Sequence, residues 1–324
     1  MPAITDVPGV LVGHAHDIDA LTGCTVVLTP AGAVGGVDVR GGGPGTRETD
    51  LLDPTAMVAV VHAIALCGGS ALGLAAASGV AEWLHARNIG FDTGLARIPI
   101  VPAAVIFDLL VGRADRWATA ELGRAACDAA GSSTLEGCVG VGAGAAVGKL
   151  LGPIGAMKSG VGSWSETLAD GTIIGALVVC NAWGDVCSAS DGRILAGTRN
   201  PQTGQFAGAM HLLRQPAYQA GLQLMARNTT LAVVATNAQL SKAETNKLAQ
   251  MAQDGLARTI RPVHTPFDGD TVFALATGER SALPLAVLGA IAADIVAQAV
   301  ERSVLQATAL GGLPAAADYS PQGA

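Results

Sequence analysis

The sequence has few aromatic residues, no long apolar run and no concentration of positive charge, and each shortage excludes a class of protein. Aromatic residues make up only 3% of the 324 residues, whereas 43 are Gly, which indicates a core of closely packed small side chains. The chain has 26 acidic and 19 basic residues. Because no basic run could follow a phosphate backbone, we expect no nucleic-acid partner.

Signals for export, membrane insertion and metal binding are also missing. Residues 1–17 lack the basic region and the unbroken apolar stretch of a signal peptide. The apolar run at 57–67 is shorter than the roughly 20 residues that a spanning helix needs. The six Cys form no CxxC pair, no HExxH motif occurs, and the six His are scattered. We therefore expect a cytoplasmic protein with free thiols, no membrane partner, no metal and no cofactor.

What the sequence does contain is an alternation of strand-like and helix-like segments with Gly-rich turns. The strand patterns occupy 24–30, 57–67, 98–112, 173–186, 229–237 and 271–278, and the helical patterns occupy 70–87, 118–130, 241–258 and 283–307. The last helix is apolar on almost every side, so we expect layers on both sides of it. With no internal repeat and no compositional break, residues 1–324 are interpreted as one layered α/β domain.

Two further segments are distinguished by their composition rather than by periodicity. Residues 191–228 are polar, rich in turn residues and weakly periodic, so we expect an exposed and mobile connection that tolerates a chain break. The residues from 311 onward are expected to form a loose tail.

Ser70 lies in the context of a nucleophilic serine without the complete motif. It follows Gly68 and Gly69 at the end of a predicted strand and precedes a predicted helix. A nucleophile elbow requires Gly-x-Ser-x-Gly, but Leu72 occupies the last position. Capping of the helix is therefore the role that we expect for Ser70.

Lys149 follows a glycine in a segment that only partly matches a phosphate loop. Ala143 stands where that loop needs Gly, and Leu150 stands where it needs Ser or Thr. A lysine in such an apolar segment either extends to solvent or belongs to a site, because burial of an unpaired charge is costly. The sequence alone leaves both possibilities open.

Three polar residues beside strands are also ambiguous. Asp268 and Asp270 flank a glycine before a strand, and residues two apart in an extended segment share a face. They form either a polar turn or a pair of carboxylates directed at one place. Asn181 ends an apolar strand, where its amide could bridge backbone groups or donate to a developing oxyanion.

The Asn-Thr-Thr step at 228–230 has two interpretations as well. It is a turn that feeds a strand, since Asn favours turns and Thr favours strands, or it is the point at which Thr229 becomes a new amino terminus. Seven segments taken together favour the second interpretation. They are RGGGPGTRETDLLDP, HAIALCGGSALGLAAASGV, IPIVPAAVIFD, GAGAAVGK, LVVCNAWGDV, NTTLAVVATN and PFDGDTVFALATG, in that order.

This pattern resembles the self-processing hydrolase family of L-aminopeptidase/D-amidase-esterases, β-peptidyl aminopeptidases and nylon-oligomer hydrolases, from about residue 4 to about residue 303. The resemblance implies an α/β fold, an αββα four-layer sandwich similar to that of N-terminal nucleophile hydrolases but with different strand connectivity. It also implies a homo-oligomer, usually of four αβ units.

The same resemblance implies self-cleavage between Asn228 and Thr229, which would leave an α-chain of residues 1–228 and a β-chain of residues 229–324. The chemistry suits these residues. A Thr hydroxyl is a weak nucleophile that needs a nearby base, and cleavage would place an α-amine, with a reference pKa of about 7.7 to 8.0, on the nucleophile itself.

The remaining site residues are also implied by the resemblance. The family's Lys falls on Lys149, its Asn on Asn181, and its acidic or polar pair on Asp268 and Asp270. Asn181 would donate to the oxyanion, Lys149 would stabilise negative charge, and the two carboxylates would hold Lys149 and the Thr229 amine. One position departs from the pattern, because Phe107 replaces a Tyr found in the aminopeptidases and the nylon-oligomer hydrolase. The substrate of any one relative therefore cannot be transferred directly.

The function expected from the sequence is an aminopeptidase or amidase that acts on small peptides, amides or esters. Endo-type hydrolysis of nylon (6-aminohexanoate) oligomers is an alternative within the same chemistry. A small-molecule-binding protein that is never processed is an alternative of another class. A serine hydrolase that uses Ser70 would leave Thr229 dispensable.

Overall fold

The computed structural model describes residues 1–219 and 228–319, and within these residues the main sheet has nine strands. They are β1 (Leu11–Asp17), β2 (Thr22–Val39), β3 (Thr46–Arg47), β4 (Val60–Cys67), β7 (Ala103–Val105), β10 (Val161–Thr167), β11 (Ile173–Asn181), β14 (Thr229–Ala238) and β16 (Thr271–Arg280). Their order is β10-β11-β14-β16-β2-β4-β7-β3, and β1 pairs with β2. Short strands outside this sheet are β5 (Phe91–Asp92), β6 (Arg97–Ile98), β8 (Ala146–Val147), β9 (Met157–Lys158), β12 (Asp185–Cys187), β13 (Ile194–Ala196) and β15 (Ile260–Arg261).

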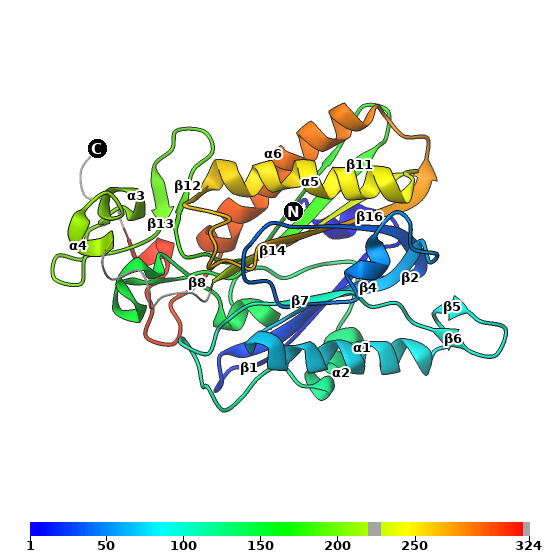
Figure 1. Cartoon of the computed structure of the whole chain (residues 1–324), viewed down its shortest axis with the longest axis horizontal. Helices are drawn as coiled ribbons and strands as arrows, with labels where there is room; N and C mark the ends of the chain where they lie inside the picture. Colours follow the sequence, from blue (N-terminus) through cyan, green and yellow to red (C-terminus); the bar gives the residue numbers. More distant parts are fainter. Residues whose placement is uncertain (220–227, 320–324) are drawn as a thin grey trace.

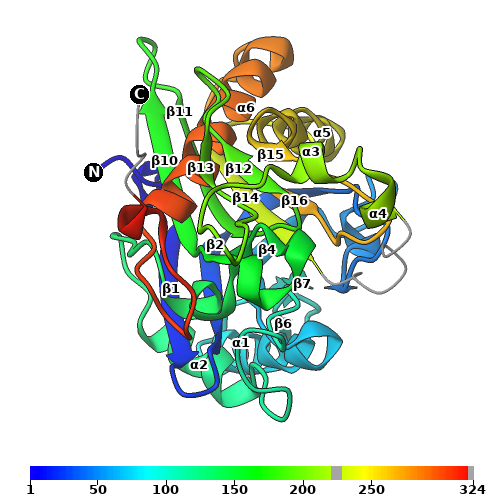
Figure 2. The same cartoon turned by 90° about the vertical axis from the view of Figure 1, so that its left-hand side faces the viewer.

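Helices cover both outer faces of this sheet (Figure 1). The helices are α1 (Ala75–His85), α2 (Ala120–Asp128), α3 (Ala209–Leu212), α4 (Pro216–Gln219), α5 (Lys242–Thr259) and α6 (Leu285–Leu305). The long strand β2 connects the two halves of the sheet, since residues 22–28 pair with β1 and residues 34–39 pair with β16. The sheet thereby folds over into two layers, with α5 and α6 on one side and α1 and α2 on the other (Figure 2).

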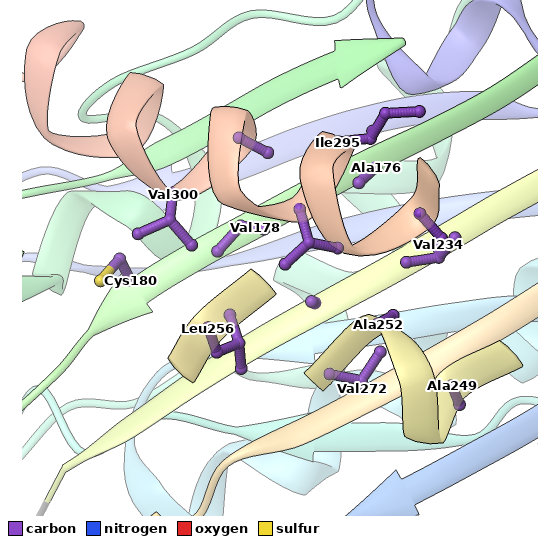
Figure 3. Packing of buried hydrophobic residues seen from close by; sticks show 14 of the residues in the cluster. Ala176, Val178, Cys180, Val234, Ala249, Ala252, Leu256, Val272, Ile295 and Val300 are labelled. Carbon is purple, nitrogen blue, oxygen red and sulfur yellow. The ribbon is translucent and has the colours of Figure 1, made fainter. Parts of the chain in front are cut away.

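Three buried clusters fill the three spaces between these four layers. The cluster between the β layers includes Leu231 and Val233 of β14, whereas the next residues along the strand, Ala232 and Val234, belong to the cluster beneath α5 and α6 (Figure 3). This alternation follows from the two-residue repeat of a strand. A third cluster lies between α1, α2 and the outer face of β2, β4 and β7. The expected αββα sandwich is confirmed.

Glycine permits the close crossing of α1 and α2. A Cβ atom added to Gly79 of α1 would lie 1.9 Å from the carbonyl oxygen of Ala120, and one added to Gly123 of α2 would lie 2.1 Å from that of Ala76. Any larger side chain would therefore force the helices apart. The contact between α1 and α2 is an example of the close packing of small residues that the composition predicts.

Helix α6 does not lie between layers as expected. It packs on α5, β10 and β11 and belongs to an outer layer, where Val287 is 44% exposed. The other predicted helices are confirmed. The capping box of α5 is present, because the Ser241 side chain accepts a hydrogen bond from the Glu244 N–H and the Glu244 carboxylate accepts one from the Ser241 N–H.

The predicted cap at Ser70 is wrong. Residues 70–74 form a short 3-10 helix before α1, and the Ser70 side chain caps neither element. Ser70 has a φ of 55°, and its N–H donates to the carbonyl of Ile106. The residue is therefore held in a left-handed turn by a strand end that lies far from it in sequence, which local capping rules do not anticipate.

Two predicted strands are shorter than expected. The 98–112 segment forms a strand only at its start and at Ala103–Val105, since Pro99 and Pro102 cannot donate to a ladder. The 173–186 segment is divided between β11, which ends at Asn181, and β12, which belongs to a separate three-stranded sheet.

The described part of the C-terminal tail is packed rather than loose. Leu313 is buried, and the carbonyl of Pro314 accepts a hydrogen bond of 2.8 Å from the N–H of Lys158. The ring of Tyr319 packs against Phe206, with centroids 5.5 Å apart. The tail therefore covers a segment of the predicted α-chain.

The described part of the connection, residues 191–219 and 228, is also more ordered than its composition indicates. It contains β13, α3 and α4, and the buried carboxylate of Asp185 accepts hydrogen bonds from the N–H groups of Thr198 (2.7 Å) and Ala209 (2.6 Å). The rest of this predicted connection, residues 220–227, lies outside the described residues. No helix in the described residues is both long enough and apolar enough to cross a bilayer.

Candidate active site

The sheet register brings the predicted site residues to the start of β14. Strands β11 and β14 pair antiparallel, with Asn181 opposite Thr229. Strand β16 runs parallel to β14 on its other side, and Asn228 forms an isolated parallel bridge with Asp268. Thr229 is buried, with 5% of its surface exposed. Residues from three distant parts of the sequence therefore surround the predicted cleavage site.

Lys149 is buried in this site and does not extend to solvent. Its Nζ donates two hydrogen bonds of 2.8 Å to Asn181, one to the backbone carbonyl and one to Oδ1. Burial lowers the pKa of Lys149 to about 7, although the negative charge of Asp268 opposes this shift. The sequence left open whether Lys149 extends to solvent or belongs to a site. Its short contacts to Asn181, a second predicted site residue, favour the site.

The orientation of the Asn181 amide follows from this contact. Its Oδ1 also accepts a hydrogen bond of 3.1 Å from the N–H of Ala146, so the oxygen is directed at two donors. Its Nδ2 donates to the carbonyl of Phe107, 3.1 Å away. The donor side of the amide is therefore directed toward the segment that contains Phe107.

The two predicted carboxylates have different partners. Asp268 accepts hydrogen bonds from the N–H (2.9 Å) and Oγ1 (2.6 Å) of Thr265, while burial and the charge of Asp270 raise its pKa. Asp270 accepts a hydrogen bond of 2.7 Å from the N–H of Thr230. Within the described residues neither carboxylate forms an ion pair with Lys149, so any effect on that lysine acts through the electric field.

His264 is a neighbour that sequence reasoning missed. Its Nδ1 lies 2.9 Å and its backbone N 3.0 Å from Oδ2 of Asp270, and its φ of 55° places it in the left-handed region. Its Nε2 is buried and lacks a hydrogen-bond partner among the described residues. The only sequence signal was its position four residues before Asp268, just outside the segment that carries the resemblance, which begins at Pro266.

Asp108 is a second group that the sequence did not single out. It is buried, and its carboxylate accepts hydrogen bonds of 2.7 Å from Thr22 Oγ1 and from the N–H of Gly69. Burial raises its pKa to about 6, and the two hydrogen bonds oppose this shift. The carboxylate thereby holds the turn that leads into Ser70.

A pocket of about 330 Å³ adjoins the nucleophile. It is lined by residues 43–45, 70–71, 105–107, 228–229 and 266–267, and none of these residues carries a charged side chain. Phe107 and Ser70 are both in the lining. Among the described residues no hydrogen bond joins the Ser70 hydroxyl to a base, so the serine-hydrolase alternative lacks the partner that it needs.

The predicted scissile carbonyl is already contacted by the predicted nucleophile. Thr229 Oγ1 donates to the carbonyl oxygen of Asn228 over 2.5 Å. The N–H of Gly269 donates to the same oxygen over 2.8 Å. No group of three or more His, Cys, Asp or Glu side chains in the described residues is arranged to hold a metal ion.

The layered αββα sandwich is a fold of the N-terminal nucleophile hydrolase type, and fold alone does not fix a function. Comparison with known proteins identifies the family within this fold type. The sequence pattern described as "Peptidase family S58" matches residues 2–316, and the chain belongs to this family of enzymes.

Curated relatives have two kinds of description. An "uncharacterized aminopeptidase" of Mycobacterium tuberculosis is 45% identical over 355 aligned positions, which cover 99% of this chain and 98% of the relative. A "6-aminohexanoate-oligomer endohydrolase" of a Kocuria species is 34% identical, with 91% of this chain and 84% of the relative covered. The chain is thus similar to both.

Solved structures share the fold at lower identity. The L-aminopeptidase D-Ala-esterase/amidase of Ochrobactrum anthropi, described as a variant of the Ntn hydrolase fold, matches with a TM-score of 0.69 at 21% identity, covering 96% of this chain and 88% of that one. A β-aminopeptidase of a Burkholderia species matches with a TM-score of 0.66 at 23% identity and the same coverage. At these identities the likeness shows the fold alone.

Proposed function

We propose that this chain is an amide hydrolase that matures by cleaving itself between Asn228 and Thr229 and then uses Thr229 as its N-terminal nucleophile. The observation that carries the proposal is the contact of 2.5 Å between Thr229 Oγ1 and the carbonyl oxygen of Asn228. Residues 1–324 would form one hydrolase domain, composed of an α-chain (1–228) and a β-chain (229–324).

The maturation step would be an N-to-O acyl shift. Thr229 Oγ1 forms a bond to the carbonyl carbon of Asn228, the C–N bond of the peptide breaks, and the hydroxyl proton is transferred to the departing amine. Water then opens the ester, which gives a carboxylate on Asn228 and restores the hydroxyl of Thr229. The new α-amine becomes the base for later turnovers, because its reference pKa lies near neutrality.

In turnover the same hydroxyl would attack an amide or ester carbonyl of the substrate and form an acyl-enzyme that water releases. Lys149 fixes the Asn181 amide with its nitrogen directed toward Phe107, which is part of the pocket lining. This orientation supports Asn181 as an oxyanion donor to the bound substrate. Lys149, with Asp268 and Asp270 nearby, would set the charge of the site.

The substrate that we propose is a small peptide, amide or ester whose acyl part carries an apolar side chain. The pocket walls include Val105, Ile106, Phe107 and Phe267, which suit apolar groups. Phe107 has no hydroxyl, so no step can depend on a phenol at this position. The 45% identity to an aminopeptidase favours release of N-terminal residues.

Endo-type hydrolysis of 6-aminohexanoate oligomers is the second candidate. It is supported by the 34% identity to an endohydrolase of such oligomers and by the uncharged lining of the pocket. Paired substrates that differ only in an acetyl group on the amine separate the two activities. Acetylation should abolish aminopeptidase activity and leave endo-type cleavage intact.

Intact mass spectrometry tests self-cleavage directly. The freshly purified protein, and the same sample after incubation at neutral pH, should give two fragments, of which the smaller begins at Thr229. Thr229→Ala should remain a single inactive chain, and Thr229→Ser should still be cleaved. Cleavage of Thr229→Ala, or an active wild-type protein that remains intact, would overturn the proposal. An intact and inactive wild-type protein would favour the small-molecule-binding alternative.

Assembly of four αβ units is proposed from the resemblance alone. Sedimentation velocity of the cleaved protein tests it, since a monomeric αβ unit and a tetramer differ fourfold in mass.

A further inference from the structure

The carbonyl oxygen of Asn228 has a second hydrogen-bond donor besides the nucleophile. The N–H of Gly269 lies 2.8 Å from this oxygen. The Thr229 hydroxyl must give up its proton when it attacks, so its own hydrogen bond is lost during the reaction. The N–H of Gly269 keeps its proton during the reaction. Its hydrogen bond therefore persists when the carbonyl oxygen becomes an oxyanion.

Contacts on both sides fix the orientation of this donor. The carbonyl of Asp268 belongs to the same peptide unit and accepts a hydrogen bond of 2.8 Å from the N–H of Gly43. In a planar trans peptide the C=O and N–H groups point in opposite directions, so this bond directs the N–H of Gly269 toward Asn228. The carbonyl of Gly269 accepts a further hydrogen bond of 2.9 Å from Thr271 Oγ1. A donor that is oriented before the reaction needs no reorganisation when charge develops.

Glycine is needed at this position for space. A Cβ atom on residue 269 would lie 2.6 Å from Thr229 Oγ1 and 3.0 Å from the carbonyl oxygen of Gly43. The first of these contacts is closer than a Cβ atom tolerates. The missing side chain therefore allows the backbone N–H and the nucleophile to approach the same carbonyl group.

In the uncleaved chain the Asn181 amide makes no hydrogen bond to the Asn228 carbonyl oxygen among the described residues. Its oxygen accepts hydrogen bonds from Lys149 and Ala146, and its nitrogen donates to the carbonyl of Phe107. We propose that the backbone N–H of Gly269 stabilises the oxyanion on Asn228 during self-cleavage, whereas Asn181 serves the later attack on substrate. This inference rests on the proposed self-cleavage and divides oxyanion stabilisation between two donors.

The test replaces the amide of residue 269 by an ester in the full-length chain. Cell-free synthesis with glycolic acid in place of Gly269 substitutes oxygen for the N–H and adds no carbon atom. Glycolic acid at Gly171 is the matched control, because the N–H of Gly171 donates to the carbonyl of Leu168 over 2.9 Å in an exposed turn. Cleavage is followed by mass spectrometry at neutral pH.

We expect the Gly269 ester to mature about 10² to 10³ times more slowly than the wild type, the usual effect of removing one oxyanion donor. The Gly171 ester should mature within about twofold of the wild type, as expected for a surface change. Equal rates for the Gly269 ester and the wild type would overturn the inference. A wild-type chain that never cleaves would instead overturn the proposed function, so the two failures are distinguishable.

Circular dichroism, with the Gly171 ester as reference, shows whether the Gly269 ester folds. If it does not fold, a second measurement tests the role of the Gly269 N–H. Thr229→Val removes the nucleophilic oxygen and should leave the chain uncleaved. A crystal structure of this variant should place the Gly269 nitrogen within about 3.2 Å of the Asn228 carbonyl oxygen. A peptide that is rotated away from this oxygen, with another donor in its place, would overturn the inference.

Discussion

Lys149 carries its amine on a buried side chain, and this burial determines its behaviour. Burial lowers its pKa to about 7, while the negative charges of Asp268, Asp108 and Asp270 limit the shift. Two hydrogen bonds to Asn181 oxygens satisfy two of the three donors of its ammonium group. The lysine therefore loses its charge near neutral pH, where ordinary lysines remain protonated.

This shift has a consequence for stability that can be measured in the uncleaved Thr229→Ala chain. The folded-state pKa of Lys149 is below its ordinary value, so the unfolded chain binds more protons between about pH 7 and 10 and stability should rise with pH there. The penalty from Lys149 is full below pH 7 and is relieved as the pH approaches 10. Lys149→Met should reduce the slope of unfolding free energy against pH by up to about 1.4 kcal/mol per pH unit, the value for one proton.

Denaturant unfolding between pH 7.5 and 9.5 measures this slope. Lys247→Met is the matched control, because Lys247 is exposed on α5, and it should leave the slope unchanged. If Lys149→Met also leaves the slope unchanged, the ammonium of Lys149 is not disfavoured by burial and its assignment to the centre of the site is wrong.

At the scale of elements, glycine contacts determine how closely α1 and α2 approach. Gly79→Ala would raise helix propensity by about 1 kcal/mol, yet its Cβ would lie 1.9 Å from the Ala120 carbonyl oxygen. We expect the steric effect to dominate and to lower the free energy of unfolding by about 1 to 3 kcal/mol. Urea unfolding measures the change. Gly131→Ala is the control, since its Cβ has no atom within 4 Å; a stabilised Gly79→Ala would contradict the tight crossing.

Elements with local signals were predictable, whereas elements fixed by distant contacts were not. The α5 helix is capped at Ser241 as predicted, because its capping box needs only residues three apart. The turn at Ser70 depends on Asp108, whose carboxylate binds the N–H of Gly69, and no local rule links these positions. The prediction of a loose tail from residue 311 is wrong, since the tail packs on Phe206, more than 100 residues away, and no local pattern marks that contact.

In the candidate site, too, some residues could be identified from the sequence and others could not. Its members were named through the resemblance of whole segments, and the register of β11, β14 and β16 brings Asn181, Thr229 and Asp268 together. His264 and Gly269 contribute through a side chain without a sequence motif and through a backbone N–H. A backbone donor has no signature in sequence, since every residue except proline has one. The catalytic roles themselves stay predictions.

At the scale of the whole molecule, the predicted cleavage would divide the chain into two fragments that share one hydrophobic core. The β-chain would supply β14, β16, α5 and α6, and β14 pairs with β11 of the α-chain while β16 pairs with β2. Both interlayer clusters next to β14 contain residues from both fragments. Separation of the fragments would therefore expose two apolar faces of the central sheet and break three strand ladders, the third being that between β12 and β15.

The matured protein should consequently behave as one particle. After cleavage, we expect the two fragments to elute together from a size-exclusion column at the volume of the uncleaved Thr229→Ala chain, and to separate only in denaturant. The physical reason is that the buried apolar surface shared by the fragments is part of the main core, and burial contributes roughly 25 cal/mol per Å². Fragments that separate in native buffer would mean that the cut lies at a weaker seam than the one between β11 and β14.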